Sequence, residues 1–369
     1  MPSSSRPHSF GPSPSVAFAA AVGLLSTLAC ANVTKLTYSE EEMRREVARR
    51  VPELEPSEIH VPYGVTPELI ERARDAVGGK QGAHDRAAAL IRSVGRDGAF
   101  GVEYRDVPTT TATEAAELGY GNCYSLAAMV VGLGRALGLD VVFIDATDRI
   151  EDHRQTFDAV VSEGHMTAAV RTQAGFVLLD FGGLLSNYRK IQRVNDLRAV
   201  AHYYSNRVFE VVDESRARGE APDWEQSARQ FETAILIDTS FTGAWNNLGV
   251  AYAKLGRDDD ALEYYRVAAA IDPKLASPYN NIGAVHLRRG ELDLAIQAFE
   301  RATELAPENP YGHYHLGLAL YRRGHEARAV EALERAVDLS PDYRKPRDLL
   351  SRIRAGGEAP TPAESHPES

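Results

Sequence analysis

The apolar positions between residues 121 and 138 have the spacing of a helix with one buried face. They are Leu126, Met129, Val130, Leu133 and Leu137. The turn residues Gly121 and Asn122 precede this stretch, and Gly138 follows it as a C-cap signal. We therefore expect Cys123 in the first helical turn, where the helix dipole favours the reactive thiolate. The alternative is a structural cysteine, because most cysteines outside disulfides are small buried apolar side chains.

Two β-rich runs farther along the chain predict a hairpin. They cover residues 165–171 and 176–181, and the polar stretch 172–175 separates them. If that stretch is a four-residue turn, Arg171 lies opposite Phe176. This one pair fixes the register, so all the remaining pairs of the two strands follow from it.

The predicted register places His165 and Asp180 on one face as diagonal neighbours, with Cβ atoms about 7 Å apart. The apolar residues of the same strand then occupy the opposite face; they are Met166, Ala168 and Val170. A cysteine nucleophile needs a nearby base, and that base needs an acceptor that orients it. Cys123, His165 and Asp180 supply these three groups. The alternative is that His165 only starts a strand and Asp180 only closes a turn.

The segment before this region has the pattern of charged helices. Ser39 followed by Glu42 is a capping box, and Thr66 followed by Pro67 is a second helix start. We therefore expect residues 30–93 to form an N-terminal helical segment.

Several motifs together carry a family resemblance. They are Thr109-x-Thr111-Ala112-x-Glu114-Ala115, Gly121-Asn122-Cys123-x-Ser125, Arg135-Ala136-x-Gly138-Leu139, His165 and Leu179-Asp180-Phe181. In this combination residues 94–204 resemble the bacterial transglutaminase-like superfamily, in its branch of exported proteins followed by tetratricopeptide (TPR) repeats. The resemblance implies a papain-like α+β fold with the cysteine on a central helix, packed against an antiparallel sheet. It also implies a Cys123–His165–Asp180 triad. Because the superfamily contains peptidases, amidases, transamidases and inactive relatives, it leaves the reaction open.

The C-terminal part of the chain repeats itself every 34 residues. Trp245-Asn-Asn-Leu-Gly recurs from Tyr279, and its last two residues recur as Leu316-Gly317. Small and aromatic positions match in the second half of each unit as well. This is the pattern of an all-α TPR solenoid, with core repeats at 242–275, 276–309 and 310–343. A degenerate repeat should precede them, and a capping helix should follow from residue 343 to 354.

TPR arrays bind peptide or protein segments on their concave face. The repeat positions predict that this groove is lined by Asn246, Val250, Asn280, Ala284, Tyr314 and Leu318. The alternative is that the repeats are only a structural support or a dimerisation surface.

The first residues have the pattern of an export signal. Residues 16–29 are apolar but short for a membrane span, and they end at Cys30. This arrangement resembles a bacterial lipobox, in which the cysteine is lipidated and becomes the mature N-terminus. Because Asn32 is not acidic, we expect an exported lipoprotein on the periplasmic face of the outer membrane. The alternative is an ordinary cleaved signal, or an uncleaved anchor, with Cys30 incidental.

Composition narrows the function classes. A net charge of −11 and the lack of a long basic stripe argue against a nucleic-acid surface. Two cysteines allow neither a disulfide framework nor a cysteine zinc site, so we expect no metal and no cofactor.

The expected organisation has five parts. They are a signal peptide (1–29), the helical segment (30–93), a transglutaminase-like domain (94–206), the TPR region (207–354) and a disordered tail (355–369). The favoured function is an exported cysteine-dependent acyl-transfer enzyme acting on a peptide or amide bond, anchored by Cys30, with a protein partner on the repeats. The alternative is a non-catalytic peptide-binding adaptor with the same fold.

Overall fold

The computed structural model describes most of the chain after the N-terminal segment. The described residues are 36–105, 108–149, 155–156, 159–160, 165–173, 175–179, 188–357 and 360. The chain divides between Thr34 and Lys35, and every described residue belongs to the second part. The predicted signal peptide and Cys30 therefore lie outside the described residues.

The N-terminal helices begin where the sequence places their caps. They are α2 (Glu40–Arg50), α3 (Pro67–Val77) and α4 (Ala83–Val94). The capping box of Ser39 and Glu42 is present, and Thr66 caps α3 with Pro67 in its first turn. Helices α3 and α4 both pack against α6, so this segment contributes directly to the core around α6.

Helix α6 (Cys123–Ala136) is the centre of the N-terminal half. It follows the short helix α5 (Ala112–Leu118) and the strand β2 (Tyr120–Gly121), which pairs in parallel with β1 (Glu103–Tyr104). All its residues from Tyr124 to Gly134 are buried. Gly132 permits this packing, because a Cβ there would lie 2.2 Å from the carbonyl oxygen of Tyr63.

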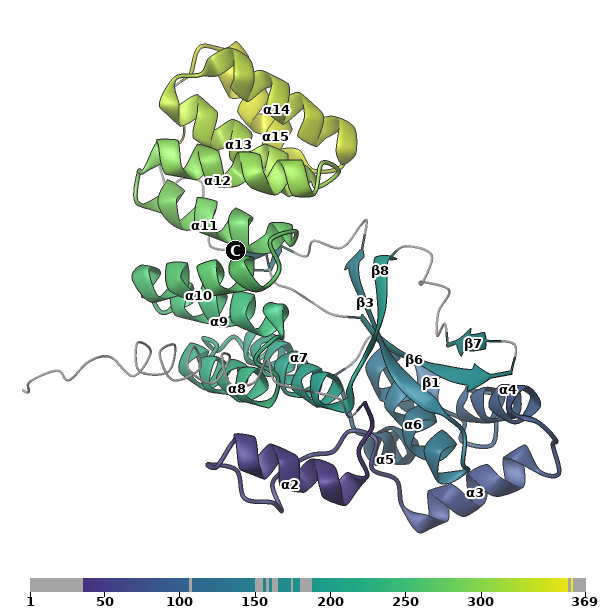
Figure 1. The fold of residues 1–369 in the computed structure, drawn as a ribbon. Helices are drawn as coiled ribbons and strands as arrows, with labels where there is room; N and C mark the ends of the chain where they lie inside the picture. Colours follow the sequence, from purple (N-terminus) through teal and green to yellow (C-terminus); the bar gives the residue numbers. More distant parts are fainter. Residues whose placement is uncertain are drawn as a thin grey trace, which may run out of the picture. The chain divides into compact units, whose positions relative to one another are not determined.

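A four-stranded antiparallel sheet packs on α6, in the order β7-β6-β3-β8 (Figure 1). The strands are β3 (Val141–Arg149), β6 (His165–Thr172), β7 (Gly175–Leu178) and β8 (Tyr188–Val194). Arg171 lies opposite Phe176, which confirms the predicted hairpin register, but Thr172 also pairs with Gly175, so the turn is shorter than the predicted four residues. The sequence did not reveal β8, nor the small pair β4 (Gln155–Thr156) and β5 (Ala159–Val160).

The two faces of the sheet have different neighbours. Phe143 pairs with Ala168, and its ring stacks on Tyr124 of α6 with the centroids 6.2 Å apart. Met166, Ala168 and Val170 therefore share the face that packs against α6, and we call this the helix face. The alternate residues of β6, including His165 and Thr167, lie on the opposite face, which we call the outer face.

The C-terminal half consists of antiparallel helix pairs (Figure 1). Helices α7 (Asp196–Ala217) and α8 (Trp224–Ile237) form the first pair, and Phe231 and Ala234 are buried on α8 as expected for a degenerate repeat. The three core repeats and the cap follow. They are α9 (Thr242–Lys254), α10 (Asp258–Ile271), α11 (Ala276–Arg288), α12 (Leu292–Leu305), α13 (Pro310–Arg323), α14 (Glu326–Leu339) and α15 (Arg344–Arg354).

One close contact recurs in each core repeat and explains the periodic glycine. A Cβ on Gly249 would lie 2.5 Å from the ring of Tyr265, and one on Gly283 would lie 2.7 Å from Phe299. Gly317 meets Leu333 in the same way. The absent side chain lets the first helix of each pair approach the second, so the large partner fills the space between them.

No helix in the described part of the chain is long and apolar enough to span a bilayer.

Candidate functional site

Cys123 occupies the first position of α6, as the sequence predicts. Its helix is capped by Asn122, whose side-chain oxygen accepts a hydrogen bond of 3.0 Å from the Ser125 amide. The amide group of Asn122 donates to the Thr109 hydroxyl at 2.9 Å, so the turn before the cysteine is held in place. The Cys123 side chain is half-buried. A half-buried thiol at a capped helix N-terminus has the environment that favours a thiolate.

His165 is the half-buried first residue of β6 and pairs with Ala146. The strand alternation places it on the outer face, whereas α6 lies on the helix face. Because the sheet lies between the outer face and α6, the His165 imidazole can contact the Cys123 thiol only by passing the end of strand β6. Since His165 is the first residue of β6 and Cys123 the first of α6, both residues are at the ends of their elements.

Asp180 lies outside the described residues, but the hairpin leads directly to it. The Leu179 amide donates to the Ala168 carbonyl at 2.9 Å, and the Thr167 hydroxyl donates to the Leu179 carbonyl at 2.6 Å. The register predicted from the turn therefore continues as far as Leu179. Its next step would set Asp180 opposite Thr167, on the face of His165, and this remains a prediction.

A second histidine and aspartate, not singled out by the sequence, lie close together in the interior. Nε2 of His202 on α7 is 3.7 Å from a carboxylate oxygen of Asp145 on β3, and both side chains are at most 3% exposed. The His202 ring packs against the Phe241 ring, with the centroids 4.1 Å apart and the planes tilted by 38°. Burial by itself would raise the pKa of Asp145, but His202 and the nearby Arg198 guanidinium hold that pKa below its ordinary value. The only sign of this pair in the sequence was the acidic residue Asp145, which directly follows the apolar run 141–144.

No group of three or more histidine, cysteine, aspartate or glutamate side chains is placed to hold a metal ion among the residues that the structure describes.

The predicted groove residues lie on the first helices of the three core repeats. Asn246 is completely buried and Asn280 is 3% exposed. The side-chain oxygen of Asn246 accepts a hydrogen bond of 2.9 Å from Asn281, which links the first two core repeats. The side-chain oxygen of Asn280 is buried without a hydrogen-bond partner in the described structure.

The other groove positions are apolar or aromatic. Val250, Tyr314 and Leu318 are buried, and Ala284 is half-buried. Strand β5 packs against α11, the helix that carries Asn280 and Ala284. The six predicted positions thus form an uncharged lining with one unsatisfied amide oxygen.

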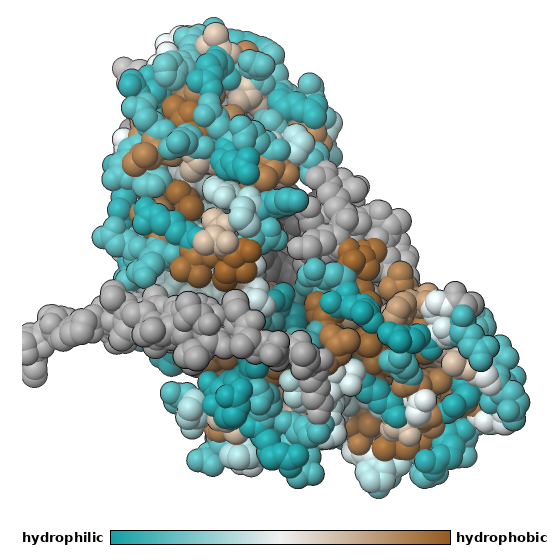
Figure 2. Space-filling view, viewed as in Figure 1, coloured by the Kyte–Doolittle hydropathy of each residue, from teal (hydrophilic) through white to brown (hydrophobic). Residues whose placement is uncertain are grey.

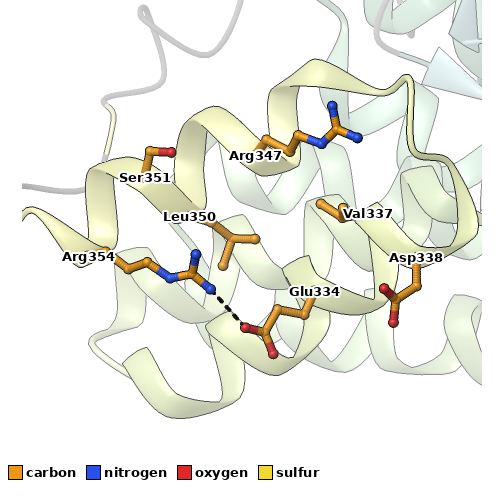
Figure 3. Close-up of a pocket in the computed structure, with 7 residues that line it drawn as sticks. All are labelled: Glu334, Val337, Asp338, Arg347, Leu350, Ser351 and Arg354. Carbon is orange, nitrogen blue, oxygen red and sulfur yellow. Dashed lines mark hydrogen bonds and ion pairs between the residues drawn. The ribbon is translucent and has the colours of Figure 1, made fainter.

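A separate depression lies between α14 and the capping helix α15 (Figure 3). It is lined by Glu334, Val337, Asp338, Arg347, Leu350, Ser351 and Arg354. Arg354 forms a 3.0 Å ion pair with Glu334 across it. Its mixed charges and its position at the cap distinguish it from the uncharged groove.

Family models identify the repeats. Two tetratricopeptide repeat models match, one at residues 242–308 and the other at residues 281–344. These matches confirm the TPR solenoid in the C-terminal region and support a protein-binding role for it. The matched residues begin after the transglutaminase-like motifs, so that resemblance rests on the motifs themselves.

Solved structures with similar helical arrays include MamA, PilF of Pseudomonas aeruginosa and YrrB. MamA is 24% identical, with 40% of this chain and 84% of that chain covered and a TM-score of 0.35. PilF is 25% identical over 42% and 71% of the two chains, with a TM-score of 0.36. YrrB, described as a TPR protein with an unusual peptide-binding site, is 19% identical over 42% and 84%, with a TM-score of 0.33. A search of the curated proteins found no match.

Proposed function

We propose that this protein binds an uncharged peptide or protein segment in the groove of its TPR array. The observation that carries this proposal is the groove lining, in which uncharged side chains recur at two positions of each repeat. The Asn280 side chain is buried beside Gly312 of α13, and its oxygen has no hydrogen-bond partner among the described groups. Because this oxygen is enclosed between α11 and α13, Asn280 supports the groove through packing between repeats and not through contact with the peptide.

Replacing Asn280 by leucine should weaken peptide binding at least tenfold, because a branched apolar side chain beside Gly312 would displace α13 and deform the groove. Peptides are first selected from a displayed random library against the full chain, and their affinities are then measured for wild type and Asn280→Leu. The exposed Gln297 on α12 supplies a matched control, Gln297→Leu, which should bind like the wild type. Thermal melting of each variant separates lost binding from lost folding. Selected peptides that bind both variants equally would refute the groove as the binding site.

A second function, cysteine-dependent acyl transfer, is favoured by the position of Cys123 at the capped start of α6. Here the Cys123 thiolate attacks the carbonyl carbon of a peptide or amide bond and forms a thioester. His165 takes the thiol proton and passes it to the leaving amine, and Asp180 orients His165. Water or another amine then releases the acyl group. If this chemistry is absent, the transglutaminase-like region serves as a non-catalytic adaptor beside the repeats.

Alkylation at pH 6 distinguishes the enzyme from the adaptor. An ordinary thiol with a pKa near 8.5 is only about 0.3% ionised at that pH. A Cys30→Ala chain leaves Cys123 as its single thiol. We expect iodoacetamide to modify it at least tenfold faster than glutathione, and a further His165→Ala change to remove most of that advantage. A rate equal to that of glutathione in both chains would contradict the enzymatic function and leave the adaptor.

We also propose that Cys30 is lipidated after export and attaches the protein to the outer membrane. The proposal is supported by the apolar stretch that ends at this cysteine. Cell fractionation of wild type and Cys30→Ala tests it, because only the wild type should remain with the membranes. Identical partitioning of the two chains would rule out the lipid anchor.

A further inference from the structure

The outer face of the sheet carries three large apolar side chains that are unusually exposed. They are Phe176 (46%), Leu178 (43%) and Ile191 (43%). Phe176 and Leu178 lie opposite Arg171 and Ala169, and Ile191 lies opposite Ala146, which also pairs with His165. Opposed residues share a face, so all three belong to the face of His165. Figure 2 shows apolar surface over the region where the ribbons of β3, β6 and β8 overlap in the view of Figure 1.

The side chains of both edge strands meet across this face. The Arg193 guanidinium of β8 lies 5.5 Å from the centre of the Phe176 ring of β7, and the Arg171 guanidinium lies 5.3 Å from it. Val142, Ile144 and Ala169 form a small buried cluster on the same face. The face thus combines an aliphatic floor with an aromatic ring held between two cations.

The charge of this face contrasts with that of the chain. The whole chain carries a net charge of −11, whereas two cations, Arg171 and Arg193, lie beside Phe176 on this face. Arg171 already pairs with Asp140 at 3.1 Å, so Arg193 is the cation with the greater capacity for an added carboxylate. Exposed apolar side chains beside such a cation suit a ligand that has both an apolar and an acidic group.

The geometry of β7 indicates how such a ligand would lie. It is the edge strand of the sheet, and an extended peptide adds to a sheet edge through main-chain hydrogen bonds. The alternate side chains of the added strand would then fall on the outer face, next to Phe176 and Leu178. Because β7 runs antiparallel to β6, its C-terminal end lies toward the end of β6 where His165 begins the strand.

We propose that the outer face binds the acyl-donor segment as an extended strand along β7. An apolar side chain of the segment packs against Phe176 and Leu178, and a carboxylate two residues away, on the same face of the segment, pairs with Arg193. This inference rests on the proposed acyl transfer at Cys123, for which it names the substrate class: extended peptides with an apolar residue and an acidic residue two positions apart, so that both side chains lie on one face.

Binding is measured by fluorescence polarisation, with the labelled octapeptide Leu-Ser-Glu-Ser-Leu-Ser-Glu-Ser, whose leucine and glutamate side chains share one face of an extended strand, and the full chain carrying Cys123→Ala. Phe176→Ser should weaken binding about tenfold. Arg193→Glu should weaken it similarly and should improve binding of the matching leucine–lysine peptide. The exposed Arg266 on α10 provides the charge-matched control, and Arg266→Glu should leave both affinities unchanged.

The outcomes separate this inference from the proposed function. Binding with the expected variant pattern supports the docking face even if Cys123 proves unreactive in the alkylation experiment. A reactive Cys123 together with no peptide binding, or with binding insensitive to both variants, overturns the docking face alone. Sedimentation that shows a dimer abolished by Phe176→Ser would also overturn it, because a second copy would then be the occupant.

Discussion

Replacing Asp196 by alanine is expected to lower the free energy of unfolding by about 3–5 kcal/mol, which is a large part of the stability of an ordinary domain. The Asp196 side chain is 1% exposed and forms a bidentate pair with Arg135, with nitrogen–oxygen distances of 2.7 and 2.9 Å. It also accepts a 2.8 Å hydrogen bond from the Tyr38 amide. Alanine would leave the guanidinium largely buried without its anion. The loss would disconnect α6 from the start of α7 and from the segment before α2.

Urea unfolding followed by circular dichroism measures this effect. A matched control is Asp293→Ala, which removes the 2.6 Å ion pair with Arg323 on the surface of the array. Both partners there are well exposed, so the control should cost less than about 1 kcal/mol. Similar decreases in the free energy of unfolding of the two variants would contradict the view that the Arg135–Asp196 pair stabilises the protein more because it is buried.

Ending the chain at Pro341 is expected to make the protein aggregate. The truncation removes α15, whose buried side chains Leu349, Leu350 and Ile353 pack in one cluster with Leu333 and Ala336. Each large apolar side chain contributes about 1.5–3 kcal/mol when fully buried, so losing three of them costs roughly 5 kcal/mol or more. The uncovered face of α14 would also be a continuous apolar surface, which promotes association.

The control ends the chain at Gly357 and keeps the whole capping helix. It retains the hydrogen bond from the Tyr321 hydroxyl to the Gly357 carbonyl and loses the 2.7 Å bond from Arg322 to the Pro360 carbonyl. Its solubility should match that of the full chain, and its melting temperature should change little. Soluble, monomeric protein after truncation at Pro341, measured by light scattering, would show that α15 is not the essential cap.

The sequence determined those features in which the residue that gives the signal and the residue that it contacts are close together along the chain. Ser39, Thr66 and Asn122 each cap a helix through an amide three residues ahead, so the helix starts could be read directly. The hairpin register followed in the same way, because the turn between Arg171 and Phe176 is short. The 34-residue period fixed the repeat helices, since each repeat packs mainly on its neighbours.

The candidate site was predictable only in its local parts. The position of Cys123 at a helix start and of His165 at a strand start follow from nearby residues. Asp180 lies outside the described residues, so the complete triad stays a prediction. How α6 lies against the sheet depends on contacts such as Phe143 with Tyr124, which no local pattern specifies.

Only the tertiary structure decided the pairings between distant residues. Strand β8 joins the sheet beside β3, and Asp145 on β3 meets His202 on α7. In both cases the partner is at least 39 residues away along the chain. A buried aspartate or histidine looks like an exposed one in the sequence, because its burial depends on which distant element covers it. Local hydrogen bonding thus determined the elements and the repeats of this protein, whereas long-range burial determined which polar and charged side chains became neighbours.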